Sequence, residues 1–302
     1  MTMYRSRRSV MRSGAGLAAG VAASGLMRGL PAFAEPVKVS TPAAERLGWR
    51  MAVQLYTYRR FPFYEALDKI ADLGVRHVEP CFFLKLDKAR PSLQTNPSLP
   101  DDVKKELKAR LDDRGMSMSS YYADLGADAD KAKRIFDFCR EMGAGVIVAE
   151  PPPEALDMIE KLCEEYRINL AIHNHPESPK QRYWSPETVL EVCKGRGKRI
   201  GACCDTGHWV RSGLDPVECL KKMEGRINAF HLKDAVEKGN RKSEDAPLGE
   251  GAGNYKAVLA ELKRQGYQGL TTIEYEKDTD HLQDDMVKCV QFVEEQAKAL
   301  GA

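Results

Sequence analysis

Short apolar runs recur about every 30 residues through most of the chain, and each is followed by a segment with the apolar spacing of an amphipathic helix. Two such segments, 63–74 and 130–143, end in glycine, as helices often do. Eight alternations of strand and helix in about 250 residues predict an α/β fold, a closed parallel (β/α)8 TIM barrel. The alternative is a doubly wound open sheet, but no glycine-rich phosphate fingerprint follows the first run. The eight predicted strands are 51–56, 75–79, 116–121, 145–150, 168–173, 200–205, 227–231 and 270–274.

Alternation along these runs predicts a barrel with a polar mouth. In the fifth run, Ile168, Leu170 and Ile172 share the face that should meet the helices, whereas His173 shares the opposite face. Parallel barrels of this kind carry their chemistry at the carboxyl ends of the strands. The ionisable residues that the same alternation turns inward at or near strand ends are His77, Glu79, Glu150, His175, Asp205, His231 and Glu274.

His173 and three of these residues lie one each at the ends of four successive runs: His173, Asp205, His231 and Glu274. Mixed imidazole and carboxylate donors suit divalent metals of the Mn, Fe, Co and Zn group. Unpaired burial of four such groups would cost several kcal/mol. We therefore predict a site for one divalent metal ion (Mn, Zn, Co, Fe or Mg).

Two connections are much longer than the rest, at 81–102 after the second strand and 235–255 after the seventh. Loops of this length in a compact domain are usually lids or binding loops. The glycine-rich stretch "PLGEGAGNY" (247–255) has neither P-loop nor dinucleotide spacing, so we assign it no phosphate role.

Four short motifs carry a family resemblance: "DTGH" (205–208), "HLKD" (231–234), "PLGEG" (247–251) and "IEYE" (273–276). With them the chain resembles the sugar phosphate isomerase/epimerase family of xylose-isomerase-like TIM barrels, over about residues 50–300. In the ketose epimerases of this group, the resemblance implies a divalent metal held by Glu, Asp, His and Glu from strands five to eight. The last three match Asp205, His231 and Glu274, and His208 matches a histidine that contacts substrate.

Strand five departs from that pattern, because "AIHNHP" places His173 where the family has its first Glu. That Glu is also one of the epimerases' two acid/base carboxylates, so a symmetric two-Glu mechanism is not expected. Glu150 could replace it as base or as ligand, and His175 could be the ligand in place of His173. The catalytic candidates are Glu150, Glu274, His175 and His208.

Such a site supports proton abstraction next to a carbonyl. Return of the proton gives a sugar isomerase or epimerase, and loss of a β-substituent gives a lyase or dehydratase. We expect the substrate to be a small keto-sugar or a 3-keto-glycoside. Aromatic and amide groups suit a sugar's mixed faces, and the candidates for sugar binding are Gln54, Tyr56, Glu79 and Lys233.

The sequence leaves two alternative functions. A metal-dependent hydrolase of the endonuclease IV type needs further ligands after strands two and three and a D-x-H pair after strand seven. Only His77 lies near strand two, and the D-x-H pair is missing. The second alternative is a periplasmic sugar-binding protein that has lost catalysis.

The N-terminus predicts export. Twin arginines Arg7 and Arg8 precede a small, apolar run, and an A-x-A pattern closes it at residues 32–34. This order is typical of a Tat signal peptide over residues 1–34 and of a periplasmic protein. Residues 35–49 would then be a linker and residues 50–302 the barrel.

Charge and cysteine content exclude other classes. Removal of the five arginines in residues 1–34 would change the formal net charge from +2 to −3, so neither nucleic acid nor, after signal removal, a membrane is an expected partner. The sequence does not decide whether the protein forms a homo-oligomer. The eight cysteines contain no C-x-x-C pair, and we expect them to be core residues without disulfides.

Overall fold

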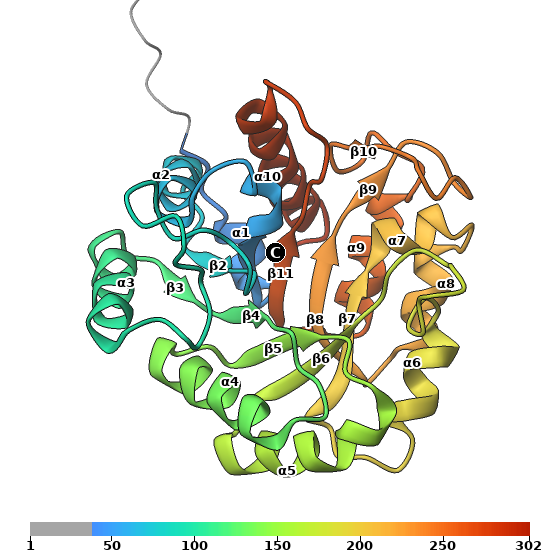
Figure 1. Cartoon of the computed structure of the whole chain (residues 1–302). Helices are drawn as coiled ribbons and strands as arrows, with labels where there is room; N and C mark the ends of the chain where they lie inside the picture. Colours follow the sequence, from blue (N-terminus) through green and yellow to red (C-terminus); the bar gives the residue numbers. More distant parts are fainter. Residues whose placement is uncertain (1–37) are drawn as a thin grey trace, which may run out of the picture. The chain divides into compact units, whose positions relative to one another are not determined.

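The computed structural model describes residues 38–302 (Figure 1). The predicted signal peptide and the start of the predicted linker lie outside the described residues. Within the part described, no helix is both long and apolar enough to cross a membrane.

Nine parallel segments form one sheet in the order β3-β2-β1-β11-β8-β7-β6-β5-β4. The sheet closes because β3 and β4 are the two halves of one strand, interrupted at Ser119, and Cys81 bridges to Tyr122. The eight-stranded barrel predicted from the sequence is therefore confirmed. Its strands are β1 (Trp49–Gln54), β2 (His77–Glu79), β3 (Ser117–Met118) with β4 (Ser120–Tyr122), β5 (Val146–Ala149), β6 (Asn169–His173), β7 (Ile200–Asp205), β8 (Ile227–Leu232) and β11 (Gly269–Ile273).

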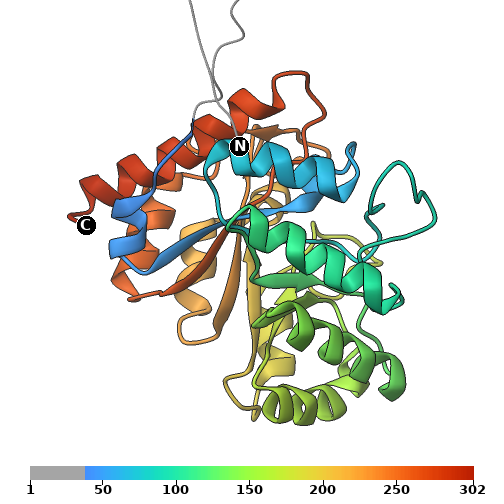
Figure 2. The same ribbon diagram turned by 90° about the vertical axis from the view of Figure 1, so that its left-hand side faces the viewer.

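Helices surround the strands, as Figures 1 and 2 show from two sides. Local signals set their ends: the Asp128 carboxylate accepts a hydrogen bond from Lys131 N at the start of α4, and Gly74 and Gly143 end α2 and α4 with a φ of 84°. The outer helices are α2 (Phe63–Leu73), α3 (Asp101–Asp113), α4 (Ala129–Met142), α5 (Leu156–Tyr166), α6 (Pro186–Cys193), α8 (Pro216–Lys222), α9 (Tyr255–Arg264) and α10 (Leu282–Ala299). The remaining helical segments are α1 (Pro42–Arg46), α7 (Thr206–Arg211) and the 3-10 turns η1 (Leu55–Tyr58) and η2 (Pro153–Ala155).

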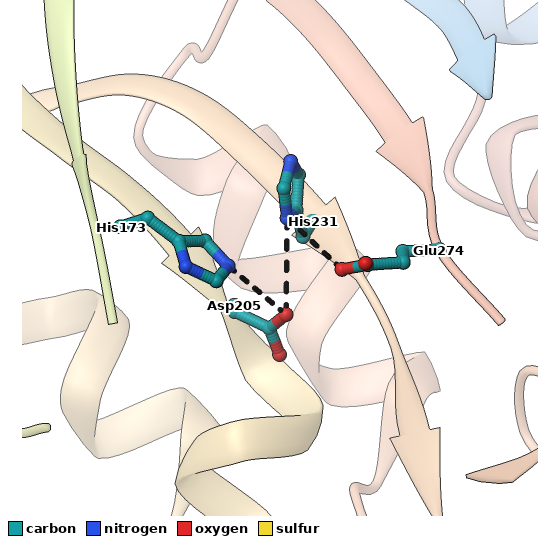
Figure 3. Close-up of side chains that lie close together, drawn as sticks. All are labelled: His173, Asp205, His231 and Glu274. Atoms are coloured by element: carbon teal, nitrogen blue, oxygen red, sulfur yellow. Dashed lines mark ion pairs between the residues drawn. The ribbon is translucent and has the colours of Figure 1, made fainter. Parts of the chain in front are cut away.

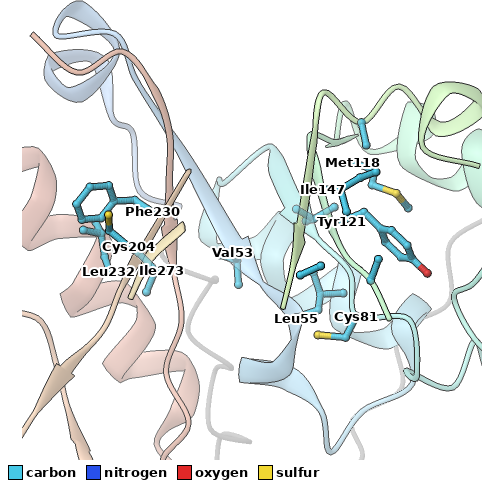
Figure 4. Packing of buried hydrophobic residues seen from close by; sticks show 14 of the residues in the cluster. Val53, Leu55, Cys81, Met118, Tyr121, Ile147, Cys204, Phe230, Leu232 and Ile273 are labelled. Carbon is cyan, nitrogen blue, oxygen red and sulfur yellow. The ribbon is translucent and has the colours of Figure 1, made fainter. Parts of the chain in front are cut away.

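Two apolar layers hold the barrel. The larger lies between strands and helices, and Figure 4 shows Phe230, Leu232 and Ile273 gathered there beside Cys204. The smaller fills the barrel interior with Ala52, Val146, Val148, Ala171, Cys203, Ala229 and Leu270. All eight cysteines are free and buried, in agreement with the prediction.

The long connection after β8 has structure that the sequence did not predict. Within this loop, the short strands β9 (Asp234–Ala235) and β10 (Asp245–Ala246) form an antiparallel pair. The Asp234 carboxylate then accepts hydrogen bonds from the backbone N–H groups of Gly249, Gly251 and Gly253. A Cβ on Gly251 would lie 2.5 Å from Asp234 Oδ1, so the glycine-rich stretch is explained by its wrapping around Asp234.

Candidate active site

Four buried side chains converge at the carboxyl end of the barrel: His173 from β6, Asp205 from β7, His231 from β8 and Glu274 directly after β11 (Figure 3). Asp205 Oδ2 lies 3.5 Å from His173 Nε2 and 3.8 Å from His231 Nδ1. His231 Nδ1 lies 3.2 Å from Glu274 Oε2. One potential ligand atom from each of the four lies within 4.8 Å of the others, so we call them the acceptor cluster.

The facing atoms of the acceptor cluster have no hydrogen-bond partner, although all are buried. The other ring nitrogen of each histidine has a carboxylate partner: His173 Nδ1 lies 2.8 Å from Glu150 Oε1, and His231 Nε2 lies 2.7 Å from Glu79 Oε1. If these nitrogens donate their protons to the carboxylates, the inner nitrogens carry lone pairs. Two lone pairs and two carboxylate oxygens then face each other, an arrangement that a divalent cation satisfies and an empty apolar space does not. The residues present therefore fit a metal ion.

Charge around the cluster supports the same conclusion. Burial raises the pKa of Asp205, but the Lys233 ammonium and the contact with His173 outweigh burial, and the net direction is downward. Burial also raises the pKa of Glu274, and Lys233 with His231 reverses that effect. Both carboxylates are therefore held in the ionised form that a metal ligand needs.

Lys233 lies inside this group of charges, with its side chain fully buried. Its ammonium lies 3.1 Å from Asp205 Oδ2, 2.8 Å from Glu274 Oε2 and 3.0 Å from Glu276 Oε1. With the first two oxygens the ammonium forms ion pairs but no hydrogen bond. Lys233 was predicted to bind sugar, but the structure does not place it on the pocket wall; it neutralises the surrounding carboxylates instead.

Glu79 was predicted to bind sugar as well, and the structure places it deeper in the barrel. Its carboxylate is fully buried, pairs with His231 Nε2 at 2.7 Å and accepts a hydrogen bond from the Ser120 hydroxyl at 2.6 Å. A carboxylate on the outer nitrogen of a metal-binding histidine fixes the ring's orientation and tautomer. Glu79 is thus placed to position His231.

A hollow of about 410 Å³, the inner pocket, opens above the acceptor cluster. Gln54 and Tyr56, two of the residues predicted to bind sugar, line it, and the Gln54 side chain also accepts a hydrogen bond from Tyr56 N. Sequence reasoning missed four lining residues, of which only Glu276 belonged to a quoted motif. The wall is formed by Gln54, Tyr56, Cys81, Phe83, Tyr122, His173, His175, His208, Glu274 and Glu276.

Two predicted histidines border the inner pocket. His208 lies in the first turn of α7, and its backbone N–H donates a hydrogen bond of 2.9 Å to Oδ1 of Asp205, the N-cap of this helix. Burial holds the pKa of His208 well below its ordinary value despite the neighbouring Asp205, so its ring is neutral. His175 is partly exposed, and its Nε2 lies 3.2 Å from Glu150 Oε1.

Glu150 lies behind these rings and is not part of the pocket wall. It contacts His173 and His175, and it accepts a hydrogen bond from the Tyr122 hydroxyl at 2.9 Å. Burial raises the pKa of Glu150, but the hydrogen bonds with His173 and His175 outweigh it and the net direction is downward. An ionised Glu150 therefore supports both imidazoles, and together the three could hold a cation.

His77 lies away from this centre. It is on β2 near the start of the strand, and its Nδ1 contacts the hydroxyls of Ser117 and Ser119 at 3.0 and 2.7 Å. The hollow that His77 lines is formed with Lys38, Thr41 and Arg50, from the opposite end of the strands. It offers no ligand for a further metal beside the acceptor cluster.

The fold and these contacts define a class of protein: a (β/α)8 barrel with a buried cluster of carboxylates and imidazoles at the carboxyl ends of β6, β7, β8 and β11. The sequence profile described as "Xylose isomerase-like TIM barrel" matches residues 67–296. The chain belongs to this family.

Individual relatives agree with that assignment. The inosose dehydratase of Geobacillus thermodenitrificans is 28% identical over 224 residues, which cover 58% of this chain and 74% of that protein. An uncharacterised protein of Parabacteroides distasonis has a crystal structure that is 33% identical, with a TM-score of 0.66 over 82% of this chain and 99% of its own. A D-tagatose 3-epimerase-like protein shares the fold at 21% identity and a TM-score of 0.66, over 83% and 98% of the two chains.

Proposed function

We propose that the protein is a divalent-metal-dependent enzyme that removes a proton next to the carbonyl of a keto-sugar or a 3-keto-glycoside. The observation that carries the proposal is the acceptor cluster, in which four buried ligand atoms face each other without hydrogen-bond partners. Two of them, Asp205 Oδ2 and Glu274 Oε2, form ion pairs with the Lys233 ammonium. A divalent cation held there supplies a Lewis acid that stabilises negative charge developing on a substrate oxygen. The dehydratase and epimerase names of the relatives support the same reaction class.

The chain's own residues divide the remaining work. His175 is on the pocket wall, and Glu150 Oε1 lies 3.2 Å from its Nε2, so the pair can take up and hold a proton. Glu274 provides a carboxylate on the opposite strand, and Glu276 lies beside it on the wall. Tyr56, Phe83 and Tyr122 offer flat apolar surfaces against which a sugar ring packs and from which water is excluded.

The two sides of the pocket are chemically unequal, because the imidazole and carboxylate pair of His175 and Glu150 faces two carboxylates, Glu274 and Glu276. An epimerase needs matched groups on both faces of the carbon, whereas an elimination needs one base and a way out for the leaving group. The unequal arrangement favours isomerisation or elimination over a symmetric epimerisation. We further propose that the protein acts in the periplasm after export by the Tat route, on the strength of Arg7, Arg8 and the A-x-A pattern.

The test is exchange of the substrate proton with solvent. Metal-loaded protein is incubated with keto-sugars and 3-keto-glycosides in heavy water, and deuterium at the carbon next to the carbonyl is followed by NMR. We expect wash-in that stops when the metal is removed with a chelator and returns when Mn or Zn is added. Tight sugar binding without any exchange or elimination would support a binding protein instead.

A further inference from the structure

A second hollow, of about 600 Å³, adjoins the inner pocket and shares Tyr56 and Phe83 with its wall. The two rings stand edge to face with their centroids 6.1 Å apart. We call this hollow the outer pocket. It lies between the segment after β1 and the long loop after β2, so a molecule whose reacting ring occupies the inner pocket can extend into it across these rings.

The loop that forms the outer pocket is held in place rather than left open. The carbonyls of Lys85 and Leu86 accept hydrogen bonds from the first N–H groups of α2, at Phe63 and Tyr64. Farther along, the Arg90 guanidinium bonds both Asp87 and Glu106. The outer pocket is therefore formed before any ligand arrives, which lowers the entropic cost of binding.

The lining of the outer pocket suits an aromatic group better than a second sugar. Its uncharged wall is almost entirely apolar, and the Tyr56 hydroxyl is its one uncharged side-chain hydrogen-bonding group. Sugar sites place amides and hydroxyls against the sugar's own hydroxyls, and this wall has no amide side chain. The uncharged lining residues are Tyr56, Phe61, Pro62, Phe83, Leu84 and Pro91.

The charges indicate an acidic occupant. Arg60 and Lys88 on the wall are paired with Asp278 and Glu65. Arg59 donates only to the carbonyls of Tyr56 and Glu276 and stacks 4.5 Å above the Tyr56 ring. The one carboxylate of the wall, Asp87, is paired with Arg90. Within residues 38–302, neither Arg59 nor Lys85 has a carboxylate at ion-pair distance, so two positive charges of the wall have no ion-pair partner. On the other side of Arg59 lies a hollow where the carboxylates of Glu244, Asp245, Glu276 and Asp278 stand beside Arg211 and Lys277.

We infer that the substrate is a 3-keto-glycoside with an aromatic, acidic aglycone, which occupies the outer pocket while the keto-sugar lies in the inner pocket. The inference rests on the proposed function. In the reaction, the C2 proton, next to the C3 carbonyl, passes to the base, and its electron pair forms a C1=C2 double bond. The bond from C1 to the aglycone oxygen breaks, and the departing phenolate takes up one proton. The products are an unsaturated keto-sugar and a free phenol, with no oxidant or reductant consumed.

Binding of unreactive glycosides tests the inference without interference from leaving-group ability. Dissociation constants of methyl, phenyl, 4-carboxyphenyl and 4-(aminomethyl)phenyl glucoside are measured by calorimetry on the metal-loaded protein. We expect the 4-carboxyphenyl glucoside to bind at least about tenfold more tightly than the methyl and the aminomethyl compounds. Equal affinity for all four would overturn the inference.

A charge reversal locates the effect. Lys85→Glu should lower the preference for the carboxyphenyl over the aminomethyl compound by about tenfold or more, because a positive charge on the wall becomes negative. The matched control is Lys105→Glu on the exposed face of α3, which should leave the preference unchanged. An unchanged preference in Lys85→Glu would also overturn the inference. Failure of the proposed function is separate, since it would show as no deuterium exchange with any keto-sugar, whatever the aglycone.

Discussion

The Glu79 carboxylate lies 2.7 Å from His231 Nε2 at a depth where neither side chain is exposed. Glu79 also accepts the Ser120 hydroxyl, so its orientation is fixed by the neighbouring strand β4. Glu79 on β2 pairs in the sheet with Gln54 on β1. Gln54 lines the inner pocket, whereas the carboxylate of Glu79 points toward His231. This contact leaves His231 Nδ1 facing the acceptor cluster.

Glu79→Gln should weaken metal binding by about 10- to 100-fold, because the charge that fixes the His231 ring is lost. Chelator competition with Zn or Mn measures the affinity directly and needs no substrate. Ser120→Ala removes only the hydroxyl that supports Glu79, and we expect a smaller loss. An affinity in Glu79→Gln equal to that of the unmodified protein would show that His231 does not need this partner.

Asp205 is both a predicted metal ligand and the N-cap of α7, and the substitutions Asp205→Ala and Asp205→Asn separate these two roles. Asp205→Ala and His231→Ala should each abolish tight binding of about one equivalent of metal while the barrel stays folded, because residues at the carboxyl ends of barrel strands serve function more than stability. Asp205→Asn should also lose the metal but keep the α7 cap, so metal-free Asp205→Ala should be less stable than Asp205→Asn by about 1 kcal/mol. Metal content and urea unfolding give the two readouts. Full metal occupancy in Asp205→Ala or His231→Ala would refute the acceptor cluster as the site.

The effect of metal on stability should depend on pH. Burial lowers the pKa of His173, but its contacts with Asp205 and Glu150 outweigh burial and the net direction is upward from 6.5. In the metal-free protein the protonated ring therefore stabilises the fold below about pH 6.5, and this contribution is lost as the pH rises through the raised pKa. Metal binding needs the unprotonated ring.

The difference in Tm between metal-loaded and chelator-treated protein should therefore increase between about pH 5.5 and 8. Thermal melts across this range check the direction. His281→Asn, in an exposed position, serves as the histidine control. A difference that stays constant with pH would mean that protons and metal do not compete at His173.

The sequence predicted the barrel and the acceptor cluster because period-two alternation and strand order carry that information. His173, Asp205, His231 and Glu274 are all inward at strand ends, and parity alone finds such residues. Parity does not give depth, since Glu79 and Lys233 are inward too but lie below the pocket wall. Depth depends on strand tilt and stagger, which a single sequence does not state.

Residues in the connections were harder to predict. Phe83 and Tyr122 line the inner pocket from the loop after β2 and from the end of the interrupted strand β4. An aromatic residue in such a position has no periodic partner to reveal its direction. The length of the loop 81–102 was the available signal, and it indicated a binding loop without identifying the residues.

The prediction on export concerns residues outside the described part. Changing Arg7 and Arg8 to Lys should leave the precursor in the cytoplasm, since the Tat route depends on the arginine pair. N-terminal sequencing of the exported protein should place its first residue near Glu35. Undiminished periplasmic yield of the double variant would remove the Tat assignment.

The last prediction concerns which residue moves the proton. Glu150 contacts both His173 and His175. His175 borders the inner pocket, whereas Glu150 does not. Glu150→Gln keeps the shape of the side chain but removes the charge beside His173, so the metal should stay bound when it is supplied in excess. Under these conditions kcat for deuterium wash-in should fall by more than about 100-fold. His175→Asn should cause a similar loss, and the double variant should lose little more than either single one, because the two act as a unit.

Glu295→Gln, on the exposed face of α10, controls for the loss of a carboxylate elsewhere. Metal content is measured beside the exchange rate, so that loss of metal in Glu150→Gln is not mistaken for loss of a base. If Glu150→Gln keeps the full rate and His175→Asn does not, the imidazole works without its carboxylate. If both variants keep the full rate, the proton is moved by Glu274 on the opposite side of the pocket, because Glu274 is the remaining predicted carboxylate on the wall.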